Sequence, residues 1–192
     1  AVVLGLDVEP AVVAPEGATI DGGGHGSVVT IQGQGVNFSG FTLRNSGRDV
    51  TEEAAGITVT GSGHVIERNR VEQVYFGVHV GDGANVTVRD NIITPGEHHG
   101  ARPGHGISAW HLRDSVLSGN RISHARDGIY LSFTARVAVT GNEITGCRYG
   151  LHSMYSEDAS FEDNQVSGNL LGAALMSSNR LIFRGNRIAH HR

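Results

Sequence analysis

The chain has 192 residues, 39% of them hydrophobic, which fits one domain with a sizeable core. The formal net charge is −4, so the composition gives no sign of a polyanionic partner such as nucleic acid. A single cysteine, Cys147, excludes an internal disulfide. No apolar run reaches the roughly 18 residues that predict a transmembrane helix.

Two residue types recur at a nearly fixed interval. The steps between successive members are 22, 29, 22, 22 and 22 for one series of asparagines, and 21, 29, 22, 22 and 22 for one series of glycines. The long step is the same seven-residue insertion in both series. The asparagines are Asn69, Asn91, Asn120, Asn142, Asn164 and Asn186, and the glycines are Gly56, Gly77, Gly106, Gly128, Gly150 and Gly172.

Aliphatic residues occupy fixed places around these two series and alternate with polar ones, which is the period of β-strands. Examples are Val71, Ile93 and Ile122, each two residues after an asparagine. One coil of about 22 residues cannot bury its own apolar face, but stacked coils form a continuous core. We therefore predict one all-β domain over residues 1–192, a single-stranded, right-handed parallel β-helix of about 22-residue coils.

The N-terminal part fits the same scheme. Ile20, Val28, Val29 and Ile31 predict early strands around the glycine-rich turn at residues 21–24. Phe41 takes the asparagine position of its coil. From Phe41 to Gly56 is 15 residues against 8 in a standard coil, so a first insertion lies at residues 45–55.

The second insertion, residues 95–104, should leave the same corner of the helix two coils later. Long loops on one side of a rigid scaffold often carry function. This loop region holds His98, His99 and His105, and the first loop holds Asp49, Glu52 and Glu53. Imidazoles and carboxylates can bind metal, although the spacing matches no defined metal motif and a solvated polar loop is the alternative.

Two arginines recur one coil apart. Arg126 and Arg148 each lie two residues before a glycine of the series, so they should be neighbours, with Asp127 as the local counter-charge. One interpretation is structural. The other makes Asp127 or His152 a general base acting on an acidic sugar.

The strand after the glycine corner predicts a soft-metal patch. His152 and Met154 alternate along one strand and should both face outward, and Met176 should lie beside Met154 on the next coil. These are the only two methionines in the chain. Thioethers and imidazole together favour Cu(I). Packing against another surface is the alternative explanation for outward methionines.

Three strings resemble one family: Arg-Asp-Gly-Ile-Tyr at 126–130, Arg-Tyr-Gly-Leu-His-Ser-Met-Tyr-Ser at 148–156, and Gly-Ala-Ala-Leu-Met-Ser at 172–177. They are similar to NosD, the periplasmic β-helix component of the machinery that matures nitrous oxide reductase. The resemblance runs from Ile20 to the C-terminus. It implies a non-enzymatic, periplasmic role in copper delivery, with ABC transporter subunits, a copper chaperone and nitrous oxide reductase as partners.

The main hypothesis is therefore a periplasmic copper-handling assembly factor. The rivals are a polysaccharide lyase or epimerase acting on acidic sugars, and a purely structural binding module. The metal-site candidates are His152, Met154, Met176, His98, His99 and His105. Because the pattern stops at Arg192 without a cap, we expect a missing C-terminal part and self-association through the open end.

Overall fold

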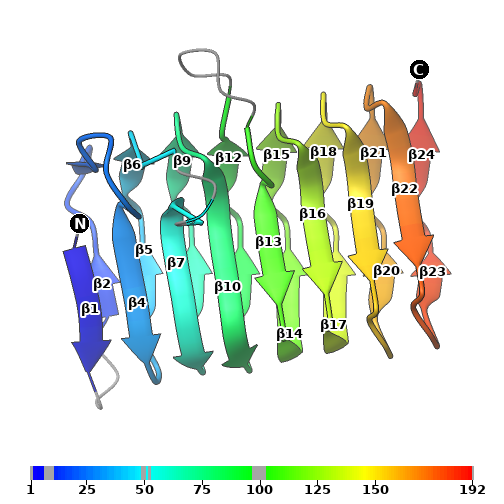
Figure 1. The fold of residues 1–192 in the computed structure, drawn as a ribbon, viewed down its shortest axis with the longest axis horizontal. Coiled ribbons are helices and arrows are strands. Elements are labelled where there is room, and N and C mark those ends of the chain that lie inside the picture. Colours follow the sequence, from blue (N-terminus) through cyan, green and yellow to red (C-terminus); the bar gives the residue numbers. More distant parts are fainter. Residues whose placement is uncertain (1, 7–10, 49–50, 52, 97–102, 192) are drawn as a thin grey trace.

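The computed structural model describes residues 2–6, 11–48, 51, 53–96 and 103–191. Its described residues form eight coils of three short strands each, stacked along one axis (Figure 1). Every strand pair is parallel, and all but one join equivalent strands of neighbouring coils; the exception is the long first-row strand β10, whose end at Ala84 pairs with Arg113 of β14. Examples of the regular pairing are Ile129 with Leu151 and Ile144 with Val166. The predicted parallel β-helix is thus confirmed, and no helix within the described ranges is long and apolar enough to span a membrane.

The first strand of each coil forms the longest row. It starts at or close to the glycine of each repeat and runs to the next corner. The row consists of β1 (Val2–Leu6), β4 (Val29–Gly33), β7 (Ala55–Ser62), β10 (Phe76–Ala84), β13 (Ile107–Trp110), β16 (Asp127–Ser132), β19 (Tyr149–Met154) and β22 (Leu171–Met176).

The second and third rows close the coil. The second row is β2 (Ala11–Val13), β5 (Asn37–Ser39), β8 (Val65–Glu67), β11 (Thr87–Arg89), β14 (Arg113–Ser118), β17 (Ala135–Thr140), β20 (Ser160–Glu162) and β23 (Ile182–Arg184). The third row is β3 (Thr19–Asp21), β6 (Thr42–Arg44), β9 (Arg70–Glu72), β12 (Ile92–Thr94), β15 (Arg121–Ser123), β18 (Glu143–Thr145), β21 (Gln165–Ser167) and β24 (Arg187–Ala189).

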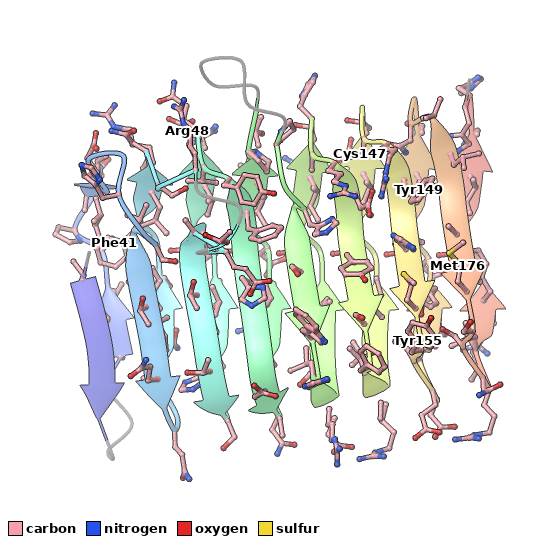
Figure 2. All side chains as sticks on the ribbon, viewed as in Figure 1. Phe41, Arg48, Cys147, Tyr149, Tyr155 and Met176 are labelled. Carbon is pink, nitrogen blue, oxygen red and sulfur yellow. The ribbon has the colours of Figure 1, made fainter. Side chains whose placement is uncertain are left out.

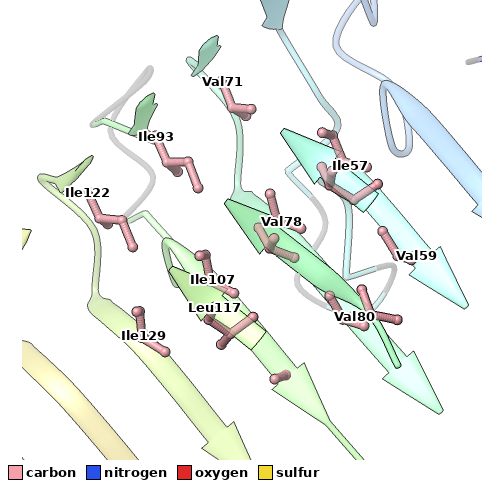
Figure 3. Packing of buried hydrophobic residues seen from close by; sticks show 14 of the residues in the cluster. Ile57, Val59, Val71, Val78, Val80, Ile93, Ile107, Leu117, Ile122 and Ile129 are labelled. Carbon is pink, nitrogen blue, oxygen red and sulfur yellow. The ribbon is translucent and has the colours of Figure 1, made fainter. Parts of the chain in front are cut away.

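The core is built from the aliphatic columns that the repeat predicts. Ile57, Val78, Ile107 and Ile129 follow the glycines on successive first strands, and all four are fully buried. Figure 3 shows them facing the column of Val71, Ile93 and Ile122 from the third strands. Burying a side chain of this kind contributes about 1.5–3 kcal/mol, so the stacked columns supply the main driving force for folding.

The asparagine column is a hydrogen-bonded ladder between the second and third strands. The Nδ2 group of Asn120 donates to Oδ1 of Asn142 over 3.0 Å, and Asn142 donates to Asn164 in the same way. Phe41 fills the corresponding place in its coil, since its backbone N–H donates to Oδ1 of Asn69. The predicted stacking of the asparagines at one corner is confirmed.

The glycine corner needs glycine because the chain packs too tightly there for a side chain. A Cβ atom on Gly128 would collide with Ile144 and would lie 2.6 Å from the carbonyl oxygen of Gly150. Both insertions leave this same corner, between β6 and β7 and between β12 and β13, as predicted. Of the acidic residues assigned to the first loop, Asp49 and Glu52 lie outside the described residues.

Candidate functional site

The outer face of the first row carries polar and aromatic side chains in register. His79 pairs with Ser108, Ser108 with Tyr130, and Tyr130 with His152, each on the next coil. These residues lie two positions after the glycines and point away from the core, as the alternation predicts. His152 is nevertheless only 6% exposed, which is less than its outward position predicts.

His105 and Asp127, the residues before Gly106 and Gly128, also reach this face, since His105 stacks on Tyr130 and Asp127 contacts His152. Asp127 is fully buried, and its carboxylate receives two hydrogen bonds of 2.9 Å from Nε and Nη2 of Arg148. Nδ1 of His152 lies 2.9 Å from the same carboxylate. The predicted counter-charge of Asp127 for Arg148 is therefore confirmed.

We call Asp127, Arg148, His105, His152 and Tyr130 the Asp127 cluster. It gathers side chains from three consecutive coils, those of β13, β16 and β19. The ring of His105 stacks on Tyr130 with centroids 4.6 Å apart, and the Tyr130 ring lies 4.9 Å from that of His152. Tyr149 adds an edge contact to His152, and the guanidinium of Arg148 sits 4.3 Å from the Tyr149 ring centroid. These rings cover His152 and explain its low exposure.

The charges of the cluster fix its protonation. Burial alone would raise the pKa of Asp127, but the hydrogen bond to His152 and the charges of His105 and Arg148 lower it below the usual value. Burial lowers the pKa of His105 to about 4. At neutral pH Asp127 is therefore an anion and His105 is neutral.

An ionised carboxylate can only accept hydrogen bonds, so His152 donates from Nδ1, and Nε2 carries the lone pair whenever the ring is neutral. This Nε2 atom is buried and has no hydrogen-bond partner. Nδ1 of His79 is also buried without a hydrogen-bond partner, and Nδ1 of His105 lies 3.4 Å from the Asp127 carboxylate without forming a hydrogen bond. A buried nitrogen without a hydrogen-bond partner costs free energy, so Nε2 of His152 is the candidate ligand atom of this face.

The two methionines lie where the register predicts. Met154 pairs with Met176 across β19 and β22. The hydroxyl of Tyr130 donates to Sδ of Met154 over 3.6 Å, while Met176 is 48% exposed (Figure 2). Within the described ranges, no group of three His, Cys, Asp or Glu side chains is placed to hold a metal ion.

The histidine-rich loop is only partly described. His98 and His99 lie outside the described residues. His105 belongs to the Asp127 cluster, where its Nδ1 is 3.4 Å from the carboxylate. From the first loop, Glu53 reaches the same face, with its Oε2 atom 3.7 Å from Nε2 of His79.

Sequence reasoning missed that His105 and Asp127 act with His152. Strict strand alternation places the residue before the glycine and the residue two after it on opposite faces. The bend at Gly128 brings both to the outer face. The signal available in the sequence was the glycine itself, which permits such a bend.

Comparison with known proteins agrees with this architecture. Residues 17–188 match the family model for the right-handed beta helix region. The chain therefore belongs to the right-handed β-helix family.

One relative is a Pseudomonas aeruginosa protein described as "Probable ABC transporter binding protein NosD". It is 41% identical over 115 residues, which is 58% of this chain and 27% of the relative. The chain thus spans about a quarter of that relative's length.

Similar solved structures include carbohydrate-active proteins. A double mutant of the periplasmic alginate epimerase AlgG superposes with a TM-score of 0.71 at 15% identity, over 94% of this chain and 46% of that one. The A-module of the Azotobacter vinelandii mannuronan C-5 epimerase AlgE6 gives 0.57 at 19% identity, over 94% and 51%. At these identities the similarity shows the fold alone.

Proposed function

We propose that this chain is a non-enzymatic, periplasmic copper-handling platform that serves the maturation of nitrous oxide reductase. The observation that carries the proposal is His152, whose Nδ1 is held by Asp127 while its buried Nε2 has no partner. A histidine that binds a metal commonly donates its other nitrogen to a carboxylate, which fixes the ring and raises its basicity.

The metal in this proposal is Cu(I), bound by Nε2 of His152 with the thioethers of Met154 and Met176. Residues two apart on a strand are separated by about 6.5 Å and neighbouring coils by about 4.8 Å, so the three side chains share one small area. A soft ion accepts sulfur and imidazole ligands, whereas hard cations prefer oxygen. His98, His99 and His105 are the second candidate set.

The partners and the location are proposed from relatives. The NosD relative is described as a probable ABC transporter binding protein, which supports a transporter as one partner. A copper chaperone and nitrous oxide reductase complete the proposed set. The proposed periplasmic location of the protein agrees with that of the periplasmic alginate epimerase that shares its fold.

The test is a Cu(I) competition titration against a chromogenic chelator. Replacing both Met154 and Met176 with Leu keeps the volume and removes the sulfur, so folding should persist while the affinity falls by about tenfold or more. His152→Ala should have a comparable effect. His124, an exposed imidazole in the link between β15 and β16, supplies the matched control, and His124→Gln should retain the parent affinity.

The outcome that contradicts the copper proposal is a double Leu variant that binds Cu(I) as tightly as the parent. Affinity lost only when His98, His99 and His105 are replaced together would move the site to the second loop.

A second candidate function is an epimerase or lyase acting on acidic sugars. It is favoured by the arrangement of the Asp127 cluster, in which a positioned imidazole, a tyrosine and an arginine lie together. His152 would take a proton from the carbon beside a sugar carboxylate, and Arg148 would attract that carboxylate. Incubation with polymannuronate tests this directly, because a lyase produces an unsaturated product that absorbs ultraviolet light and an epimerase produces guluronate.

A further inference from the structure

Two rows of exposed side chains follow the corner between the first and second strands, and we call them together the corner surface. Each of four consecutive coils contributes one residue to each row. The ring row is His111, Phe133, Tyr155 and Ser177, and the charged row is Asp114, Arg136, Asp158 and Arg180. Phe133 stacks on Tyr155 with ring centroids 4.9 Å apart, and both rings are half exposed. Tyr155 marks this surface in Figure 2.

The backbone is unfavourable for bulky residues at this corner. All eight residues of the two rows have φ angles between 47° and 55°, which lie in the left-handed region. The preceding coil has Asp82 and Asn85 at the same two places, and these residue types tolerate that conformation. Half-exposed rings recover little free energy from burial. Phe133 and Tyr155 at strained positions therefore point to a role for the surface itself.

The charged row alternates in sign along the helix axis. Arg136 donates from Nη2 to Asp114 over 2.8 Å, and Arg180 donates from Nη2 to Asp158 over 2.9 Å. All four side chains remain between 38% and 61% exposed, so they can also meet charges on another molecule. Neighbouring coils lie about 4.8 Å apart, so the sign changes at each step over a length of about 14 Å.

Two further charges lie between the rows. Arg113 pairs in register with Ala135, and Ala135 pairs with Glu157 on the following coil. Glu157 accepts a hydrogen bond of 2.8 Å from Arg180. With Arg113 and Glu157 included, the corner surface carries three arginines and three carboxylates, so its formal charge is zero. Two such surfaces therefore meet without repulsion between net charges.

We propose that the corner surface joins two copies of the chain in an antiparallel dimer. When an alternating row of four charges is turned end for end, each carboxylate comes to lie opposite an arginine. A two-fold axis between the coils of β16 and β19 therefore sets Asp114 against Arg180 of the second copy, and Arg136 against Asp158 of the second copy. Each of these pairs occurs twice across the interface.

The same rotation aligns the rings. Phe133 comes to lie opposite Tyr155 of the second copy, so the two half-exposed stacks cover each other. Arg113 comes within one coil of Glu157 of the second copy. An unrelated partner would need a matching order of charges, whereas a copy of this chain already has it. The interface requires neither copper nor the Asp127 cluster.

Sedimentation of the chain carrying Phe183→Lys tests the dimer, because Phe183 is an exposed ring at the C-terminal end that offers a different route to association. Exposed ion pairs and a few rings make a weak contact, so the dissociation constant should lie at about 1–100 μM. Raising the salt concentration from about 0.05 to 1 M should weaken the dimer by about tenfold or more, since its pairs are screened.

The rings are tested by replacing Phe133 and Tyr155 together with asparagine, which tolerates the left-handed conformation. The double variant should keep a melting temperature within a few degrees of the parent, while its dissociation constant rises by about tenfold or more. His124→Asn replaces another exposed ring at a left-handed position and should leave the dimer unchanged.

The decisive experiment mixes two charge variants. Arg136→Asp sets two carboxylates against each other across the two-fold axis, and Asp158→Arg sets two guanidinium groups against each other, so each variant alone should be monomeric. In a mixture, each variant supplies the charge that the other needs. A heterodimer should therefore form with about the parent affinity, and a fluorescent label on one variant follows it.

Three results would overturn the proposal. The first is a Phe183→Lys chain that stays monomeric at about 100 μM and low salt. The second is a mixture of the two folded charge variants that forms no heterodimer, which would leave the charged row with a role inside one chain only. The third is a dimer that survives the loss of both rings unchanged. Cu(I) binding at His152 is measured separately, so either proposal can fail without the other.

Discussion

His105 shows how one buried side chain makes stability depend on pH. Its ring lies stacked between Phe76 and Tyr130, and burial lowers its pKa to about 4 from an ordinary value of 6.5. Between these two values the unfolded chain binds a proton at this residue and the folded chain does not. The free energy of unfolding should therefore decrease as the pH falls from 6.5 to 4, by roughly 3 kcal/mol from this residue.

Urea unfolding of the parent and His105→Gln at several pH values measures this contribution. The variant should be less stable at neutral pH, because it loses the stacked ring. Its stability should also decline less steeply over the acid range. His124→Gln, which replaces an exposed imidazole, should keep the parent slope. Equal slopes for all three proteins would show that His105 does not contribute to the acid sensitivity.

At the scale of the structural elements, the asparagine ladder ties the second and third strands of successive coils together. Asn142 accepts from the backbone N–H of Asn120 and donates to the carbonyl oxygen of Leu117, with distances of 3.0 and 2.9 Å. Asn142→Ala leaves both buried groups without partners, so it should lower the free energy of unfolding by about 2–4 kcal/mol. The neighbouring Glu143→Ala should change it by less than about 0.5 kcal/mol, because Glu143 is exposed.

The elements were predictable from the sequence because the stacking register repeats. The spacing of the asparagines and glycines located the corners, and the aliphatic columns located the buried faces of the strands. Two features escaped this reasoning. The bend at Gly128 brings Asp127 to the outer face beside His152, whereas the two-residue alternation of a regular strand predicts that Asp127 faces inward. Phe133 and Tyr155 adopt left-handed backbone angles at the corner after the first strand, and the residue types phenylalanine and tyrosine do not predict that conformation.

At the scale of the whole molecule, the coils contact only their neighbours, so the last coil exposes what the inner coils bury (Figure 1). Phe161 is fully buried, whereas Phe183, in the same column one coil later, is 41% exposed. Likewise Val166 is 1% exposed and Ile188 is 37% exposed. Among the described residues, β23 and β24 pair only with β20 and β21, so their other edges are open, and such edges favour pairing with another chain.

We therefore predict that the 192-residue chain self-associates through this end. Phe183→Lys places a charge within the exposed apolar column and should shift the mass measured by light scattering toward the monomer. Val116→Lys adds the same charge on the side of the helix, where Val116 is 38% exposed, and should leave the association unchanged. Because the contact between the chains buries apolar surface, raising the salt concentration should not dissociate them. A parent chain that stays monomeric at high concentration would exclude self-association. Equal effects of both lysine variants would show that the chains associate through another surface.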